Sequence, residues 1–152
     1  MMTSLRLSQP SRTPGGTVLL DTSVCVDLLR ERAHGLRGPA HSALAQLGDT
    51  RLYLSMYSVC ELSTGALLSP RQPREQRLVS EFVHHLTVLY PDTAFPTLYA
   101  EAAATLIRNG TPIPVMDLLI GITAKSHGLT VLTRDKRHFF RIPGLAVEYY
   151  LE

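Results

Sequence analysis

Short apolar runs alternate along this chain with longer segments in which apolar residues recur at helical spacing. The runs at residues 17–20, 51–55, 87–90 and 129–133 predict strands, and residues 145–150 predict a fifth strand that is antiparallel or lies at an edge. Helices are predicted between them, over residues 23–35, 39–47, 57–68, 74–86, 92–108 and 116–127. Strands that alternate with helices of this length indicate an α/β fold with a mainly parallel sheet covered on both faces.

Proline and polar residues mark the ends of several predicted helices. The pair Pro70 and Pro73 separates two of them, and Asp92 is placed to cap the long helix that stops at Asn109-Gly110. These signals leave no long segment without a predicted element after residue 17.

The length of 152 residues and the apolar content of 45% fit one domain, which we expect to span residues 17–152. Residues 1–16 contain no continuous apolar run, so we expect a flexible N-terminal extension and no secretory signal. No apolar stretch approaches the roughly 18 residues that span a bilayer, which favours a cytoplasmic protein without a membrane partner. Cys25 and Cys60 lie in apolar segments without metal-site spacing, and we expect both thiols to be buried.

Four acidic residues stand out by their positions. Asp21 directly follows the first predicted strand and Asp135 closely follows the fourth, so both belong at the edge where ligands bind open parallel sheets. Taken singly, Asp21, Asp117 and Asp135 are explained by helix capping. Glu61 is harder to explain, because it lies on the predicted inner face of a helix, where an unpaired charge is costly.

Taken together, these acids predict a metal site. Carboxylates that converge on one point repel each other unless a cation lies between them, and Mg²⁺ or Mn²⁺ prefers such oxygen ligands. One ion, or a pair about 4 Å apart, polarises a phosphate and activates water for attack on a phosphodiester. The net charge is only +2, but with four carboxylates reserved for metal the 15 basic residues outnumber the remaining acidic ones, which suits a polyanion.

The segments VLLDTSVCVDLLR, SVCELSTG and IPVMDLLIGITAKSHGLTVLTRDKRHFFRIPGL resemble, in order, the motifs of PIN-domain ribonuclease toxins of the VapC family. The resemblance runs from about residue 17 to residue 149. It implies a PIN-like three-layer α/β/α sandwich with four to five strands that binds Mg²⁺ or Mn²⁺ and cleaves RNA. It also implies a cognate VapB-type antitoxin that blocks the active site, and a homodimer.

Carried over motif by motif, the resemblance makes Asp21, Glu61, Asp117 and Asp135 the four catalytic and metal-binding acids. Thr133 matches the family's small hydroxyl residue beside the last acid, where it could orient water or phosphate. Asp27 lies on a different helical face from Asp21 and is expected to have a surface or structural role.

The chain departs from the family pattern in two places. Residues 1–16 precede the family's usual start, and His138 stands where an acidic residue is common. No catalytic histidine is assigned, and the other histidines are expected at the surface or at helix caps. The basic residues near the fourth acid could hold RNA phosphates, although each also fits a solvated helix end: Arg134, Lys136, Arg137 and Arg141.

Two alternatives remain open at this point. A phosphotransfer domain also uses an acid after the first strand, but the phosphatase motif needs an aspartate where this chain has Ser23, and a receiver domain has only Asp92 after the third strand. A catalytically idle PIN module that only binds a regulatory partner is the second, and the presence of all four acids argues against it.

Overall fold

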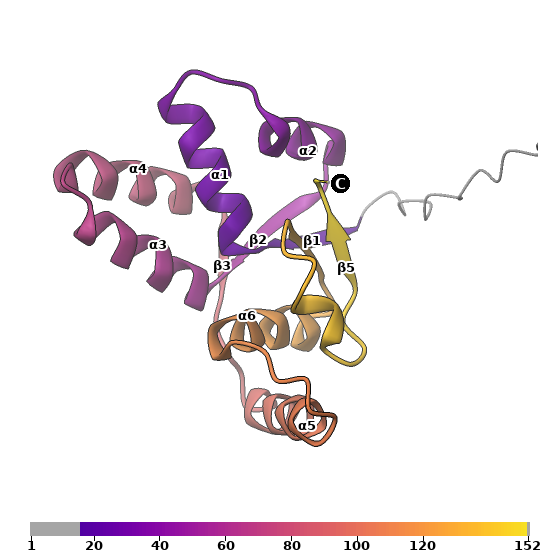
Figure 1. Ribbon diagram of the computed structural model, residues 1–152. Helices are drawn as coiled ribbons and strands as arrows, with labels where there is room; N and C mark the ends of the chain where they lie inside the picture. Colours follow the sequence, from indigo (N-terminus) through magenta and orange to yellow (C-terminus); the bar gives the residue numbers. More distant parts are fainter. Residues whose placement is uncertain (1–15, 152) are drawn as a thin grey trace, which may run out of the picture.

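The computed structural model describes residues 16–151, and the extension expected over residues 1–16 lies outside them except for Gly16. One five-stranded sheet, with the order β3-β2-β1-β4-β5, runs through the molecule (Figure 1), and every neighbouring pair of strands is parallel. The strands are β1 (Thr17–Leu20), β2 (Arg51–Ser55), β3 (Thr87–Leu89), β4 (Thr130–Thr133) and β5 (Val147–Tyr149). The helices are α1 (Thr22–Ala33), α2 (Pro39–Leu47), α3 (Met56–Leu68), α4 (Gln72–His84), α5 (Phe95–Arg108), α6 (Val115–Ser126) and the 3-10 helix η1 (Phe139–Arg141).

The alternation of side chains along β1 divides the core into two parts. Val18 and Leu20 pack in a cluster with buried residues of α1, α2, α3 and α4, whereas Leu19 packs with α5, α6 and η1. Successive side chains of a strand point to opposite faces, so the apolar run of β1 supplies both clusters. The result is the expected three-layer α/β/α arrangement, with α1 to α4 on one face of the sheet and α5 and α6 on the other (Figure 1).

The fifth strand was predicted to be antiparallel or to lie at an edge of the sheet. It lies at the edge, and it runs parallel to β4. Val147 pairs with Val131 and Tyr149 with Thr133. Parallel neighbours need a crossover of about a dozen residues, and residues 134–146, with η1 among them, provide it. This crossover carries Asp135 and His138 as well as the four basic residues Arg134, Lys136, Arg137 and Arg141.

Three local predictions were wrong. Helix α4 begins at Gln72, not at residue 74, because proline is tolerated in the first helical turn and Pro73 lies there. The α5 N-cap is Ala94, and the Asp92 carboxylate accepts a hydrogen bond from its backbone N–H at 3.0 Å in the preceding turn. Cys25 is buried as expected, but Cys60 is exposed because it lies on the outer side of α3.

The topology places the central strand β1 between β2, which follows it, and β4, which comes later in the chain. The order of strands therefore reverses between β1 and β4, and such switch points are where open parallel sheets bind ligands. Asp21 follows β1 and Asp135 lies just beyond β4, so the two acids flank this point. No helix within residues 16–151 is long and apolar enough to cross a membrane.

Candidate metal centre

Asp21 is the most constrained of the four acids. It is the N-cap of α1 and is only 4% exposed. Its Oδ1 accepts a hydrogen bond from the Thr22 N–H at 2.7 Å, and its Oδ2 accepts from the hydroxyls of Ser23 at 2.7 Å and Thr133 at 2.8 Å. Burial raises the pKa of Asp21 above its ordinary value, and the hydrogen bonds from Ser23 and Thr133 oppose this rise. The carboxylate therefore has a fixed orientation.

Glu61 comes from the middle of α3 and is half-buried. Its Oε1 accepts a hydrogen bond from the Thr22 hydroxyl at 2.7 Å, and the same hydroxyl lies 3.0 Å from Ser58 Oγ. Thr22 thus contacts two acids at once, Asp21 through its backbone N–H and Glu61 through its side chain. This threonine, which follows the first acid in the sequence, was not among the predicted site residues.

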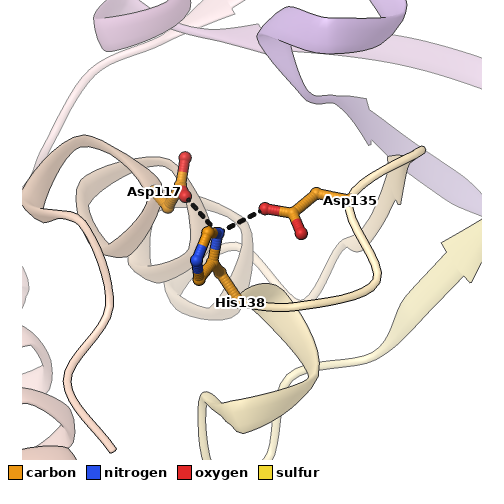
Figure 2. Close-up of side chains that lie close together, drawn as sticks. All are labelled: Asp117, Asp135 and His138. Atoms are coloured by element: carbon orange, nitrogen blue, oxygen red, sulfur yellow. Dashed lines mark hydrogen bonds and ion pairs between the residues drawn. The ribbon is translucent and has the colours of Figure 1, made fainter.

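Asp117 and Asp135 meet around a histidine. Asp117 lies in the first turn of α6, whose N-cap Pro114 makes no side-chain cap, and Asp135 lies in the loop after β4. His138 Nδ1 is 2.6 Å from Asp135 Oδ2 and 3.1 Å from Asp117 Oδ2 (Figure 2). One ligating atom from each of these three residues lies within 4.8 Å of the others.

Thr133 joins the two halves of this centre. It is completely buried, donates its hydroxyl hydrogen to Asp21, and accepts a hydrogen bond from the Asp135 N–H at 2.9 Å. The hydroxyl that was predicted to orient water or phosphate is thus engaged by the protein itself. A continuous series of polar contacts now connects all four acids, in the order Glu61, Thr22, Asp21, Thr133, Asp135, His138 and Asp117.

The electrostatics of the centre fit a bound cation. The pKa of Asp117 is raised to about 6 overall, mainly by burial and next by the negative charge of Asp21. The charges of Asp135 and Glu61 contribute to the same rise, while His138 opposes it. Mutual repulsion of this kind is relieved by a divalent cation, and carboxylate oxygens are ligands that Mg²⁺ and Mn²⁺ accept. The donor set therefore suits such an ion.

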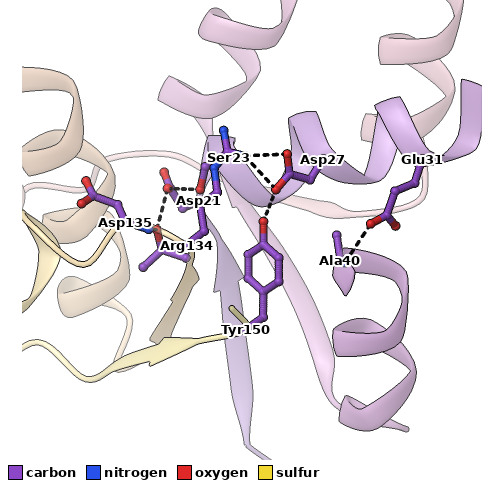
Figure 3. A network of polar contacts seen from close by, with 9 residues as sticks. Asp21, Ser23, Asp27, Glu31, Ala40, Arg134, Asp135 and Tyr150 are labelled. Carbon is purple, nitrogen blue, oxygen red and sulfur yellow. Dashed lines mark hydrogen bonds and ion pairs between the residues drawn. The ribbon is translucent and has the colours of Figure 1, made fainter. Parts of the chain in front are cut away.

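The four predicted RNA-binding residues have different environments. Arg134 Nη1 lies 2.9 Å and 3.1 Å from the two carboxylate oxygens of Asp27, and the Tyr150 hydroxyl donates a hydrogen bond to the same carboxylate (Figure 3). Asp27 thus ties the segment after β4 and the chain beyond β5 to α1. The guanidinium of Arg134 is paired with this acid.

The other basic side chains are exposed. Lys136 and Arg137 line a hollow of about 430 Å³ together with Ser23 and Asp135, and Arg134 and Leu151 complete its wall. The guanidinium carbon of Arg141 lies 5.8 Å from the Phe140 ring centroid, further along the crossover. The hollow therefore adjoins Asp135 and carries positive charge.

Sequence reasoning missed the position of His138, although the residue was recognised as a departure from the family pattern. The spacing Asp135-x-x-His138 places two ligand types three residues apart, which is the signal that could have identified it. Two other histidines lie where they were expected, at helix ends: His34 Nδ1 contacts the Arg30 carbonyl at 2.8 Å, and His127 Nδ1 contacts the Thr123 carbonyl at 2.9 Å.

Most of the sequence matches a known protein family. The family model described as PIN domain matches residues 18–145, a span that contains all four acids. The chain belongs to the PIN-domain family. The resemblance inferred from the motifs is therefore confirmed, and so is the α/β/α fold that it implied.

Within that family, this PIN domain is similar to VapC proteins. It is 32% identical over 130 residues to the tRNA(fMet)-specific endonuclease VapC of Salmonella typhimurium, which covers 86% of this chain and 95% of that protein. It is 29% identical over 127 residues to Ribonuclease VapC1 of Haemophilus influenzae, with 84% and 92% covered. The crystal structure of DNA-bound VapBC from Salmonella typhimurium superposes with a TM-score of 0.79 at 29% identity, covering 90% of this chain and 99% of that one.

Proposed function

We propose that this PIN domain is a divalent-cation-dependent endoribonuclease and the toxin of a VapBC-type toxin-antitoxin pair. The observation that carries the proposal is the series of polar contacts that gathers Asp21, Glu61, Asp117 and Asp135 at the carboxyl edge of the sheet. The VapC relatives from Salmonella typhimurium and Haemophilus influenzae, which match this chain over most of their length, are named as an endonuclease and a ribonuclease. These names support RNA as the substrate class.

The four acids are the proposed ligands of Mg²⁺ or Mn²⁺. Their oxygens are of the type that these ions prefer. The pKa of Asp117 is raised mainly by burial and then by the negative charge of Asp21, and a bound ion would neutralise that charge. When bound, the cation supplies a Lewis acid for the scissile phosphate and lowers the pKa of a water molecule that attacks it.

The remaining residues of the centre hold the acids in place. The Asp21 carboxylate accepts hydrogen bonds from Thr22, Ser23 and Thr133. These bonds limit its rotation, so its orientation is set before substrate binds. Preorganised charged groups of this kind lower the cost of reorganisation during the reaction. We propose that Thr133 acts as a positioning residue and does not itself touch the substrate.

We propose that RNA phosphates bind along the crossover after β4. Lys136 and Arg137 line the hollow beside Asp135, where they can neutralise the phosphates that flank the scissile bond. Arg141 is exposed further along the same segment. Arg134 contributes less to RNA binding than its position in the sequence suggested, because its guanidinium is paired with Asp27.

The proposed protein partner is a cognate VapB-type antitoxin. A related structure from Salmonella typhimurium is a VapBC complex, and we extend the same kind of pairing to this chain. A homodimer remains a further proposal from family membership. Co-expression of the protein with its candidate antitoxin, followed by size-exclusion chromatography with light scattering, tests both assemblies.

The decisive experiment is incubation of the purified protein with total cellular RNA in EDTA, in Mg²⁺ and in Mn²⁺, followed by mapping of the new ends. We expect cleavage only with a divalent cation and none by the Asp21→Asn or Asp117→Asn variants. Glu101→Gln, on the exposed side of α5, is the matched control and should cleave normally. Equal activity of wild type and both site variants, or cleavage in EDTA, would contradict the proposal.

A further inference from the structure

His138 is the one member of the centre that is not a carboxylate or a hydroxyl. It stands in the crossover between β4 and η1, and its side chain is 27% exposed. The ring is turned so that Nδ1 faces the oxygens of both Asp117 and Asp135 (Figure 2). The same nitrogen atom thus occupies the space between the two acids.

An imidazole in this place has two opposite consequences for metal binding. If the ring proton is on Nδ1, the imidazole donates to the two acids and competes with a cation for their oxygens. If the proton is on Nε2, Nδ1 presents a lone pair to the same point and becomes a third ligand. The distances permit the second arrangement, because neighbouring ligands around one ion are about 3 Å apart, and Nδ1 lies 2.6 Å from Asp135 Oδ2 and 3.1 Å from Asp117 Oδ2.

We propose that His138 Nδ1 coordinates the same ion as Asp117 and Asp135, and that this mixed nitrogen and oxygen set makes the centre prefer a first-row transition dication such as Mn²⁺ over Mg²⁺. Mg²⁺ is bound mainly by oxygen, whereas imidazole nitrogen strengthens binding of the transition metals. The inference rests on the proposed function, since it specifies the metal chemistry of the same site.

The packing around the crossover supports a fixed position for this ring. Phe139, the next residue, is completely buried against α6, and Ile142 is buried in the same cluster. The Asp135 carboxylate also accepts a hydrogen bond from the Arg137 N–H at 2.6 Å, which constrains the short segment between Asp135 and His138. A ligand held by its neighbours loses little conformational freedom when it binds an ion.

The test is direct measurement of metal binding by the full-length protein without RNA. Mn²⁺ and Mg²⁺ affinities are obtained by calorimetric titration of the wild type, His138→Gln, His138→Glu and the control His41→Gln, whose side chain is exposed at the start of α2. Pulsed electron paramagnetic resonance of the Mn²⁺-loaded protein reports whether a nitrogen nucleus is directly bound. Circular dichroism verifies that each variant is folded.

We expect a nitrogen coupling in the wild type and in His41→Gln, and its loss in His138→Gln and His138→Glu. His138→Gln should weaken Mn²⁺ binding about tenfold or more and Mg²⁺ binding by less than about threefold. His138→Glu replaces the imidazole nitrogen with a carboxylate oxygen, so it should lower the ratio of Mn²⁺ affinity to Mg²⁺ affinity. Because the readouts are spectroscopic and calorimetric, they do not depend on nuclease activity.

Two results would overturn the inference. Tighter binding of both metals by His138→Gln would make His138 a competitor of the cation, and unchanged affinities with no nitrogen coupling would make it a bystander. Either result leaves the proposed function standing if Asp21→Asn and Asp117→Asn still abolish metal-dependent cleavage. Absence of any metal binding by the wild type would overturn both proposals.

Discussion

The hydroxyl of Thr133 donates a hydrogen bond to Asp21 Oδ2 over 2.8 Å, although the two residues are 112 positions apart in the chain. The contact crosses from the end of β4 to the end of β1, which are neighbours in the sheet. Because Thr133 also accepts from the Asp135 N–H, it holds the first and fourth acids in one arrangement.

Replacement of Thr133 by valine tests this link. Thr133→Val keeps the shape but removes a buried acceptor and donor, so the free energy of unfolding should fall by about 1 to 3 kcal/mol. Displacement of the acids should lower the rate of RNA cleavage by up to about a hundredfold. Thr133→Ser retains the hydroxyl and serves as the control in urea denaturation and cleavage assays. Normal cleavage by Thr133→Val would show that the hydroxyl does not position the acids.

Asp117 should make the stability of the metal-free protein depend on pH. Its pKa rises from 3.8 to about 6 in the folded protein, so the folded state binds more protons than the unfolded state between these values. Stability from this group is therefore present at pH 4 and is lost as the pH rises through 6. A rise of this size corresponds to at most about 3 kcal/mol, and solvent screening at this half-buried side chain reduces it to about 1 to 2 kcal/mol.

Urea denaturation in EDTA at pH 4 and pH 7.5 measures this effect. Asp117→Asn should be more stable than the wild type by about 1 to 2 kcal/mol at pH 7.5, with little difference at pH 4. Addition of Mn²⁺ should raise the melting temperature of the wild type more above pH 6 than below it. A wild type that gains stability between pH 4 and pH 7.5 relative to Asp117→Asn would contradict the sign of the shift.

Arg134 and Arg137 should contribute differently to RNA binding. Both arginines line the hollow beside Asp135, but of the two only the Arg134 guanidinium forms an ion pair within the described part of the chain, with Asp27. Arg137→Ala should reduce the slope of log affinity against log salt by about 0.7, the value for one phosphate contact on a single strand. Arg134→Ala should leave the slope nearly unchanged and instead cost about 0.5 to 1 kcal/mol of stability.

Fluorescence anisotropy with a labelled single-stranded RNA in EDTA measures these slopes without cleavage. Asp27→Asn provides a matched test, because it releases the guanidinium of Arg134 and should strengthen RNA binding at low salt. Equal loss of slope in Arg134→Ala and Arg137→Ala would show that the ion pair does not withdraw Arg134 from RNA.

Glu31 should stabilise the start of α2 from a neighbouring helix. Gly38, the N-cap of α2, has no side chain to cap it, and the Glu31 carboxylate accepts from the N–H groups of Ala40 and His41, both at 2.9 Å. Glu31→Ala should lower the free energy of unfolding by about 1 to 2 kcal/mol, as loss of a cap does. In urea denaturation the free energy of unfolding of the control Glu101→Ala, at an exposed position, should stay within about 0.5 kcal/mol of the wild-type value. An equally small change in Glu31→Ala would show that Glu31 does not cap α2.

Two helical glycines should respond oppositely to alanine. A Cβ at Gly65 on α3 meets nothing within 4 Å, so Gly65→Ala should stabilise the protein by about 0.5 to 1 kcal/mol. A Cβ at Gly121 on α6 would collide with the buried Ile142 and lie 3.3 Å from Leu145 Cδ2. Gly121→Ala should therefore be destabilising, because overpacking typically costs about 1 to 3 kcal/mol. Thermal denaturation of both variants is the measurement, and stabilisation by Gly121→Ala would mean that the crossover yields to the added methyl group.

Much of the fold follows from local pattern. Strands of three to five residues and α-helices of nine or more have different apolar periods, so their order along the chain was predictable, with end errors such as the start of α4 at Gln72. The edge at which Asp21 and Asp135 lie was also predictable, because the carboxyl ends of parallel strands share one edge. These inferences need only sequence neighbours and one rule of topology.

The sequence by itself determined the alternation of elements, the α/β class and the acids that the motifs mark, because these depend on residue type and spacing. Only the tertiary structure decided that β5 runs parallel to β4, that Asp27 pairs with Arg134, and that His138 stands between Asp117 and Asp135. Each of these depends on contacts between segments distant in the chain. Their partners are chosen by how the layers pack, which no local pattern of polar and apolar residues encodes.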